Sequence, residues 1–249
     1  MFSLTGQAAF VTGAGRGLGE AIARGLSEAG ARIVLADIDG DAAHAVATAM
    51  QSEGRECIAM PLDVRDEAAF ARCFDAAVQR FGAIDVMVNN AALTPSTSLW
   101  DIGADEWDDV MAINLRGSFF GCRIAGRHMR ERKSGRIVNL SSMAGQQAST
   151  ATGVHYAASK AALLALTRSF AQELAPSGVT VNAIAPAAIR SPVLDAMDES
   201  RQRALQATIP LRRFGEGREV AAAVVYLASE AGAFTTGATL DLNGGRFMR

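Results

Sequence analysis

Tyr156 and Lys160 are the residues whose types and spacing point most clearly to chemistry. They stand four positions apart in the sequence Tyr-Ala-Ala-Ser-Lys, and in a helix this spacing puts both side chains on one face, one turn apart. An ammonium group near a phenol stabilises the phenolate and lowers its pKa from about 10. A phenol tuned in this way can give a proton to a carbonyl oxygen, or take one from an alcohol, near neutral pH.

Two further observations distinguish this pair from an ordinary surface pair. Ser142 ends a strand-like segment, where its hydroxyl could hydrogen-bond a substrate oxygen as charge builds on it. Lys133 and Lys160 are the only lysines among 24 basic residues, all the others being arginine. Lysine is the cation whose pKa shifts readily on burial, so its use at position 160 favours a chemical role.

A glycine-rich turn near the N-terminus lies between a short apolar run and a helical apolar pattern. The residues from Thr12 to Gly19 read T-G-A-G-R-G-L-G, which fits T-G-x-x-x-G-x-G rather than G-x-G-x-x-G. Strand, glycine loop and helix form the first half of a βαβ unit. The glycines allow the backbone to approach a pyrophosphate, and the N-terminus of the following helix attracts its charge. A dinucleotide site is therefore predicted.

Asp37 bears on which dinucleotide this is. It ends the next strand-like segment, where a carboxylate can accept hydrogen bonds from the adenosine ribose and repel a 2′-phosphate. Arg16 is a competing signal, because a cation in the glycine loop could pair with a 2′-phosphate. Asp37 is followed by Ile38 rather than by a basic residue. NAD is therefore favoured over NADP.

Strand-like and helical segments alternate along the whole chain and must position these residues. We expect strands over 8–12, 32–37, 56–63, 84–90, 136–141, 179–184 and 238–242, and helices after the glycine loop and over 41–53, 67–81, 105–132, 154–174 and 220–229. This alternation predicts an α/β fold: a single-domain, Rossmann-like, doubly wound sheet of seven mainly parallel strands, flanked by helices on both faces and spanning 1–249. The irregular stretch 186–218 is expected to hold a substrate lid at about 187–213.

Composition excludes several other classes of protein. A hydrophobic content of 49% with 20% charged residues indicates a globular core, and a net charge of −2 gives no reason to expect nucleic acid or a membrane as partner. No apolar stretch long enough to span a bilayer and no secretion signal is visible, so a cytoplasmic location is expected. Cys57, Cys73 and Cys122 are widely spaced; they are expected to be reduced core residues, and no metal site is expected.

Taken together, these motifs resemble the short-chain dehydrogenase/reductase family over essentially the whole chain. The glycine motif of the family corresponds to the turn at 12–19, its adenine-side aspartate to Asp63 followed by Val64, and its N-N-A-G motif to Asn89-Asn90-Ala91-Ala92, with alanine in the last position. The catalytic residues that the resemblance implies are Asn114, Ser142, Tyr156 and Lys160.

The resemblance also implies a role for each of these residues. Tyr156 would be the general acid and base, and Lys160 would bind the nicotinamide ribose and lower the pKa of the phenol. Ser142 would position the carbonyl group, and Asn114 would hold a water that joins the lysine to solvent. Without the resemblance, Asn114 is a polar residue within a helix and is expected to face solvent.

The residues expected to contact the dinucleotide come from six parts of the chain. They are Gly13, Arg16, Gly17, Leu18, Gly19, Asp37, Ile38, Asp63, Val64, Asn90, Ala91, Ala92, Tyr156, Lys160, Pro186, Ile189 and Ser191. Two departures from the family pattern are visible: Ala187 follows Pro186 where glycine is usual, and Ser142 precedes Tyr156 by one position more than is usual. The resemblance also implies a homotetramer, formed through the two long helices and the C-terminal region.

The sequence thus predicts an NAD-dependent oxidoreductase that interconverts a secondary alcohol, of polyol, sugar or hydroxyacyl type, and the corresponding ketone. One alternative is an NADPH-dependent 3-oxoacyl-thioester reductase, with Arg16 on the 2′-phosphate. Another is a catalytically silent dinucleotide-binding or assembly protein, against which the intact Ser142, Tyr156 and Lys160 argue. Residues that select the substrate, a small-molecule alcohol or ketone, are expected in 94–99, 143–155 and 187–213.

Overall fold

Seven parallel strands form one sheet in the computed structural model, which describes residues 1–148 and 151–248. The strands are β1 (Ala8–Thr12), β2 (Arg32–Asp37), β3 (Cys57–Pro61), β4 (Val86–Asn89), β5 (Gly135–Leu140), β6 (Val179–Pro186) and β7 (Thr239–Leu242). Their order is β3-β2-β1-β4-β5-β6-β7, and every neighbouring pair is parallel. The predicted doubly wound, Rossmann-like sheet is confirmed. The order reverses between β1 and β4, which is where ligands of such sheets bind.

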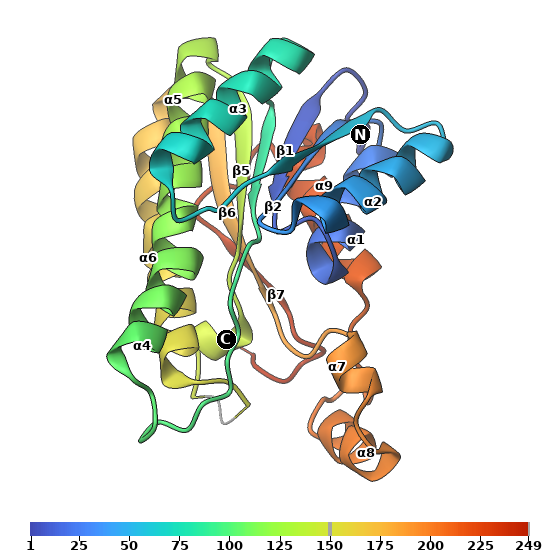
Figure 1. Ribbon diagram of the computed structural model, residues 1–249, viewed down its shortest axis with the longest axis vertical. Helices are drawn as coiled ribbons and strands as arrows, with labels where there is room; N and C mark the ends of the chain where they lie inside the picture. Colours follow the sequence, from blue (N-terminus) through green and yellow to red (C-terminus); the bar gives the residue numbers. More distant parts are fainter. Residues whose placement is uncertain (149–150, 249) are drawn as a thin grey trace.

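Helices cover both faces of the sheet (Figure 1). One layer consists of α1 (Gly17–Glu28), α2 (Gly40–Ser52) and α9 (Gly217–Ala228), and the other is built from α3 (Glu67–Phe81), α5 (Ser118–Arg132) and α6 (Val154–Leu174). Alternate strand residues supply the two cores, since successive side chains point to opposite faces. Val11 and Leu35 pack into the first layer, whereas Phe10 and Val34 pack into the second.

The segment predicted as one helix over 105–132 is interrupted. It consists of α4 (Ala104–Met111), a π-helical stretch η1 (Ala112–Gly117) and α5. Two tertiary contacts accompany the interruption: Gly117 packs so closely on Val64 that a Cβ would come within 2.8 Å of it, and the side chain of Asn114 is bonded to another segment. Such π-helical turns are often found at functional sites.

The segment expected to be irregular contains two short helices, so that expectation was wrong. They are α7 (Pro192–Asp195) and α8 (Glu199–Ala207), which begin at the capping side chains of Ser191 and Asp198. Figure 1 shows both helices projecting from the layered body. The base of the projection is fixed by a β-bridge between Ile189 and Gly215.

The remaining features concern cysteines, short turns and membrane spans. Cys57, Cys73 and Cys122 are buried and free, as predicted. Single 3₁₀ turns form η2 (Met143–Gly145), η3 (Ala175–Ser177) and η4 (Glu230–Gly232). Among the residues that the structure describes, no helix has the length and apolarity needed to cross a membrane.

Candidate active site

The glycine loop lies at the carboxyl end of β1, where the strand order reverses. Gly13 and Gly17 have φ angles of +65° and +59°, which favour glycine, and α1 begins at Gly17. A Cβ on Gly19 would collide with the carbonyl oxygen of Gly13. The first turn of α1 therefore lies directly against the end of β1, and its free N–H groups face the region where an anion is stabilised.

Asn90 fixes this loop from the neighbouring strand β4. Its Nδ2 donates to the carbonyl oxygens of Thr12 at 2.9 Å and of Gly13 at 3.0 Å. In return, Thr12 Oγ1 accepts from the backbone N–H groups of Asn90 and Ala91. The amide of Asn90 thus ties β4 to the loop, while the residue also lines the cavity described next.

A cavity of about 480 Å³ extends from the glycine loop toward Tyr156 and Lys160. The residues that line it and were expected to contact the dinucleotide are Gly13, Arg16, Leu18, Gly19, Asp37, Ile38, Asp63, Val64, Asn90, Ala91, Ala92, Tyr156 and Lys160. Four expected residues lie elsewhere. Gly17 starts α1, Pro186 ends β6, Ile189 lines a second cavity of about 220 Å³, and Ser191 caps α7.

Asp37 and Arg16 lie at one end of this cavity but differ in their surroundings. Asp37 is buried, and its two oxygens accept from the backbone N–H groups of Gly15 at 2.8 Å and of Asp39 at 2.9 Å. The side chain of Arg16 is exposed, with its guanidinium 3.9 Å from the carboxylate of Asp39. Asp37 is therefore held in place, whereas Arg16 is held only by a weak surface ion pair.

Asp63 is an expected adenine contact that also has a partner within the chain. The guanidinium of Arg65 lies 2.8 Å from its carboxylate, and its hydrogen bonds hold the pKa of Asp63 below the usual range. Val64, the next residue, is buried against Gly117 of η1. The loop after β3 is thus anchored on both sides.

Lys160 is buried at the other end of the cavity. Its Nζ donates to the carbonyl oxygen of Leu140 at 2.6 Å and lies 5.7 Å from the centre of the Tyr156 ring. Burial lowers the pKa of Lys160 to about 8. The predicted placement of the two side chains on one face of α6 is therefore observed.

Tyr156 itself differs from the expectation in one respect. Its hydroxyl is hydrogen-bonded to the side chains of Ser142 and Thr94, yet burial raises its pKa above the ordinary value and outweighs the lowering effect of those two bonds. The sequence predicted a lowered pKa. The direction is wrong for the protein's own groups because removing phenolate from water costs more than these two bonds return.

Asn114 does not face solvent, so that expectation was also wrong. It is fully buried, its Oδ1 accepts from the backbone N–H of Leu93 at 2.7 Å, and its Nδ2 donates to the carbonyl oxygen of Leu93 and to Ser159 Oγ. Ser159 lies on α6, between Tyr156 and Lys160 in the sequence. Asn114 therefore connects the π-helical stretch to both the catalytic helix and the segment before Thr94.

Three further groups contact the catalytic residues and were not predicted from the sequence to do so. Thr94 bonds the tyrosine hydroxyl, the carbonyl of Leu140 receives the lysine, and Ser141 Oγ donates to the carbonyl oxygen of Lys160 at 2.8 Å. Thr94 had been assigned only to substrate selection. Backbone acceptors carry no signal in the residue types, so only the position of Leu140 at a strand end could have pointed to it.

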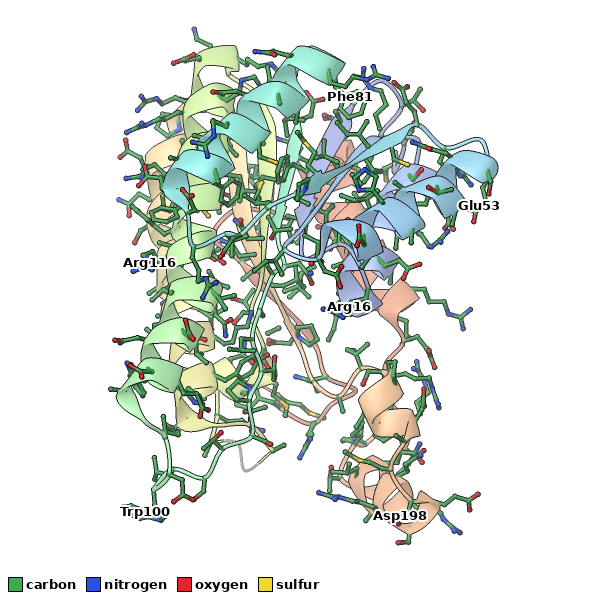
Figure 2. The ribbon with its side chains drawn as sticks, in the orientation of Figure 1. Arg16, Glu53, Phe81, Trp100, Arg116 and Asp198 are labelled. Atoms are coloured by element: carbon green, nitrogen blue, oxygen red, sulfur yellow. The ribbon has the colours of Figure 1, made fainter. Side chains whose placement is uncertain are left out.

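The segments expected to select the substrate surround this end of the molecule. Figure 2 shows Trp100 and Asp198 at the tips of two separate projections on the same side of the molecule, with Arg16 above the space between them. Within 143–155, Ser149 and Thr150 lie outside the described residues. Thr94, at the start of the 94–99 segment, lines the cavity.

The residues of this site fit a nicotinamide dinucleotide. Gly13 and Gly19 pack too closely to carry side chains, so the backbone N–H groups of the loop stay open to a pyrophosphate. A family model described as enoyl-(acyl carrier protein) reductase matches residues 13–246. The fold and site define an oxidoreductase that acts on carbonyl or alcohol groups. The chain belongs to the short-chain dehydrogenase/reductase family, whose members use NAD or NADP.

Relatives of known name agree with this assignment. The chain is 37% identical over 246 residues to a 3-oxoacyl-[acyl-carrier-protein] reductase, FabG, of Vibrio cholerae, covering 99% of each chain. It is 38% identical to an uncharacterised oxidoreductase of Mycobacterium bovis, covering 98% of each. A 3-oxoacyl-[acyl-carrier protein] reductase of Brucella melitensis, solved with bound NAD, superimposes with a TM-score of 0.92 at 32% identity, covering 100% of this chain and 94% of that one.

Proposed function

We propose that this protein is an NAD-dependent oxidoreductase that interconverts a secondary alcohol and a ketone, with Tyr156 as the general acid and base. One observation carries the proposal: the Tyr156 hydroxyl, bonded to Ser142 and Thr94, belongs to the same cavity as the glycine loop and Lys160. A proton donor and a dinucleotide cradle in one cavity are the two parts that carbonyl reduction needs.

The chemistry divides between the dinucleotide and the side chains. Bound nicotinamide supplies the hydride to the carbonyl carbon, or accepts it from the alcohol carbon. Tyr156 gives its hydroxyl proton to the carbonyl oxygen in reduction and takes the alcohol proton in oxidation. Ser142 donates a hydrogen bond to the same oxygen and stabilises the charge that develops on it. The phenol is protonated at neutral pH and is available as the acid in reduction; the rise in its pKa on burial makes it a weaker acid, which a cation beside the phenolate would offset.

Lys160 and Asn114 support the tyrosine in different ways. Lys160 places a titratable cation at the cavity wall, where it would hold the nicotinamide ribose and would offset negative charge on the phenolate. Asn114 holds Leu93 and thereby the backbone next to Thr94. Its part in a water-mediated proton path stays a prediction from the family resemblance.

Asp37 supports NAD as the cofactor. Its carboxylate is buried and fixed by two backbone N–H groups, so it cannot turn away from a 2′-phosphate. Like charges about 4 Å apart near a protein surface repel by about 4 kcal/mol at an effective dielectric constant of about 20. Arg16 is exposed and already lies near the carboxylate of Asp39. Its attraction for a 2′-phosphate is therefore weaker than the repulsion from Asp37.

The second candidate is the NADPH-dependent reduction of a 3-oxoacyl thioester. The observations that favour it are the 37% identity to the 3-oxoacyl-[acyl-carrier-protein] reductase of V. cholerae and the position of Arg16 at the cavity wall. A catalytically silent dinucleotide-binding protein is disfavoured, since Tyr156 and Lys160 line the cavity and Ser142 bonds the Tyr156 hydroxyl. In either enzyme the residues 187–213, with α7 and α8, act as the substrate lid of a single domain spanning 1–249.

A homotetramer is the assembly proposed for the chain. A wide groove of about 930 Å³ runs between the 108–119 segment and α6, with the half-buried apolar side chains of Met111, Leu115, Phe119 and Leu166 along it. Such an apolar face on the two longest helical segments suits a second copy of the chain. Leu115→Glu should lower the mass measured by light scattering; an unchanged mass would contradict this interface.

The catalytic proposal is tested by assaying a panel of polyols, sugars, ketones and 3-oxoacyl thioesters with NADH, NADPH and their oxidised forms. We expect turnover of at least one alcohol–ketone pair, a preference for NAD(H), and loss of activity in Tyr156→Phe with dinucleotide binding retained. A strong preference for NADPH would establish the second candidate. Undiminished turnover by Tyr156→Phe would refute the assigned acid and base.

A further inference from the structure

His155 precedes the tyrosine in sequence, and its placement is unexpected. Adjacency to Tyr156 is the one reason the sequence gives to place His155 in the pocket, and it is a weak one because a neighbour on a helix usually points elsewhere. In the structure its side chain is fully buried at the start of α6, and its Nε2 lies 2.9 Å from Oε1 of Glu106 on α4. The first turn of the catalytic helix is therefore bonded through a side chain to a different element.

Glu106 has a second partner in the substrate-side segment. Its carboxylate accepts a hydrogen bond from the side chain of Thr97, and this bond, with that of His155, holds the pKa of Glu106 below the usual range. An ionised carboxylate can only accept, so Nε2 of His155 carries the proton of their bond. The indole of Trp107 stacks on the imidazole at 6.3 Å between ring centres and 18° between planes.

Gly153 shows that the chain is adapted to this imidazole. Its φ angle of −61° is one that any residue can adopt, so backbone conformation does not require glycine there. A Cβ at this position would collide with the imidazole ring of His155. The backbone N–H of Gly153 donates to the carbonyl oxygen of Pro95 at 2.9 Å. The lack of a side chain at Gly153 therefore leaves room for the imidazole, and its backbone N–H holds the segment 93–97 at Pro95.

The segment 93–97 is consequently held at three points. Asn114 bonds the backbone of Leu93, Gly153 bonds Pro95, and Glu106 bonds Thr97. Thr94, which bonds the hydroxyl of Tyr156, lies between the first two points. Two of the three attachments are made by partners of His155, because its ring lies against Gly153 and bonds Glu106.

We infer that His155 and Glu106 form a positioning pair that aligns the start of α6 with the segment 93–97, and so fixes Thr94 against the Tyr156 hydroxyl. The inference rests on the proposed role of Tyr156. Nδ1 of His155 is buried and has no hydrogen-bond partner among the described residues, so the bond to Glu106 is the one that orients the ring. Neither residue lines the dinucleotide cavity.

The first test replaces the imidazole while following turnover and dinucleotide binding separately. His155→Phe should lower kcat about 10- to 100-fold, as expected for misalignment of an acid and its substrate, with the KM for dinucleotide changed by no more than about twofold. The primary isotope effect with nicotinamide deuterated at C4 should rise, because the chemical step becomes slower than release. His155→Gln, which keeps a donor near the position of Nε2, should recover most of the lost kcat.

His128 provides the matched control. It is a partly buried histidine on α5 whose Nε2 accepts from the backbone N–H of Ile84, before β4 and thus at the opposite end of the sheet. His128→Phe should lower the melting temperature and leave kcat within about twofold of wild type. Equal kcat in His155→Phe and wild type, or equal losses in His155→Phe and His155→Gln, would overturn the inference.

The second test uses the contact between Gly153 and the ring. Gly153→Ala alone should lower kcat, since the imidazole must move, whereas in a His155→Ala background the same change should have a clearly smaller effect. Additive effects would overturn the inference. Tyr156→Phe, measured in parallel, separates this inference from the proposed function. Full activity of Tyr156→Phe would refute the proposed function. An inactive Tyr156→Phe together with unaffected His155 variants would refute only the positioning pair.

Discussion

The two sides of the cavity are built in different ways. On the dinucleotide side, the backbone of the glycine loop packs directly on the end of β1, and its N–H and C=O groups bond the side chains of Asp37 and Asn90. On the substrate side, the segment 93–97 pairs with no strand among the described residues; it is held by the side chains of Asn114 on η1 and Glu106 on α4 and by the backbone N–H of Gly153 just before α6.

This difference explains which part of the site a sequence can reveal. Backbone-built geometry needs glycine where chains approach closely, and it therefore leaves a spaced glycine motif. Side-chain-built geometry uses residues such as Asn114 and His155, which look like ordinary helix residues. Lys160 and Tyr156 lie where the two sides meet, so variants at Lys160 should show the largest effects.

Lys160→Met should reduce kcat by about 10³-fold, because the proton transfer loses its supporting cation, and general acid–base catalysis contributes about 10² to 10⁴. Dinucleotide binding through Asp37 and the glycine loop should weaken far less. Steady-state kinetics with a dinucleotide titration measures both. A kcat within tenfold of wild type would contradict the role given to the lysine.

The same variant should change the pH dependence of stability. Burial lowers the pKa of Lys160 from its ordinary 10.5 to about 8, so between these values the unfolded chain binds a proton that the folded protein does not. The contribution of this group to the free energy of unfolding therefore rises with pH across that window, by about 3 kcal/mol. The difference between wild type and Lys160→Met in urea unfolding at pH 7.5 and 10 should show this rise; a constant difference would refute it.

Asp37→Ser tests the dinucleotide side alone. Removing the fixed carboxylate should shift the ratio of kcat/KM for NADPH over NADH upward by about 100-fold, since about 1.4 kcal/mol corresponds to tenfold and part of the repulsion is screened. Arg16→Ala in the Asp37→Ser background should reverse part of this gain. An unchanged ratio would show that Asp37 does not select the cofactor.

Ala187→Gly should have the smallest effect. The family pattern has glycine here, but Ala187 is not among the residues with positive φ, and its N–H donates to the carbonyl oxygen of Leu242 at 3.0 Å. Alanine is therefore unstrained, and the free energy of unfolding should change by no more than about 0.5 kcal/mol, with kcat within about twofold. A larger gain in kcat would show that this position limits lid movement.

Much of the fold could be predicted from the sequence. The bounds of β2, α3 and α6 were predicted as observed, because continuous apolar runs, amphipathic spacing and capping residues such as Asp66 act locally. The short helices α7 and α8 were missed because α8 buries no side chain and so leaves no apolar period. The π-helical stretch was missed because it accompanies contacts to Leu93 and Val64, which are distant in sequence.

The candidate site was predicted in residue type more successfully than in physical state. Tyr156, Lys160 and Ser142 do meet, but the direction of the phenol pKa was wrong because burial depends on the whole fold. Asn114, which the helix pattern alone placed facing solvent, is fully buried, as is His155. Residues whose partners lie on other elements cannot be assigned from spacing along one helix.

The most direct test of hydride transfer follows deuterium placed at both hydrogen positions of C4 of the reduced nicotinamide. With a ketone substrate found in the panel, wild-type protein should yield an alcohol that carries the deuterium on its carbinol carbon, while Tyr156→Phe should yield almost none at equal dinucleotide occupancy. Product alcohol without deuterium, or equal labelled product from the two proteins, would contradict hydride transfer assisted by the Tyr156 proton.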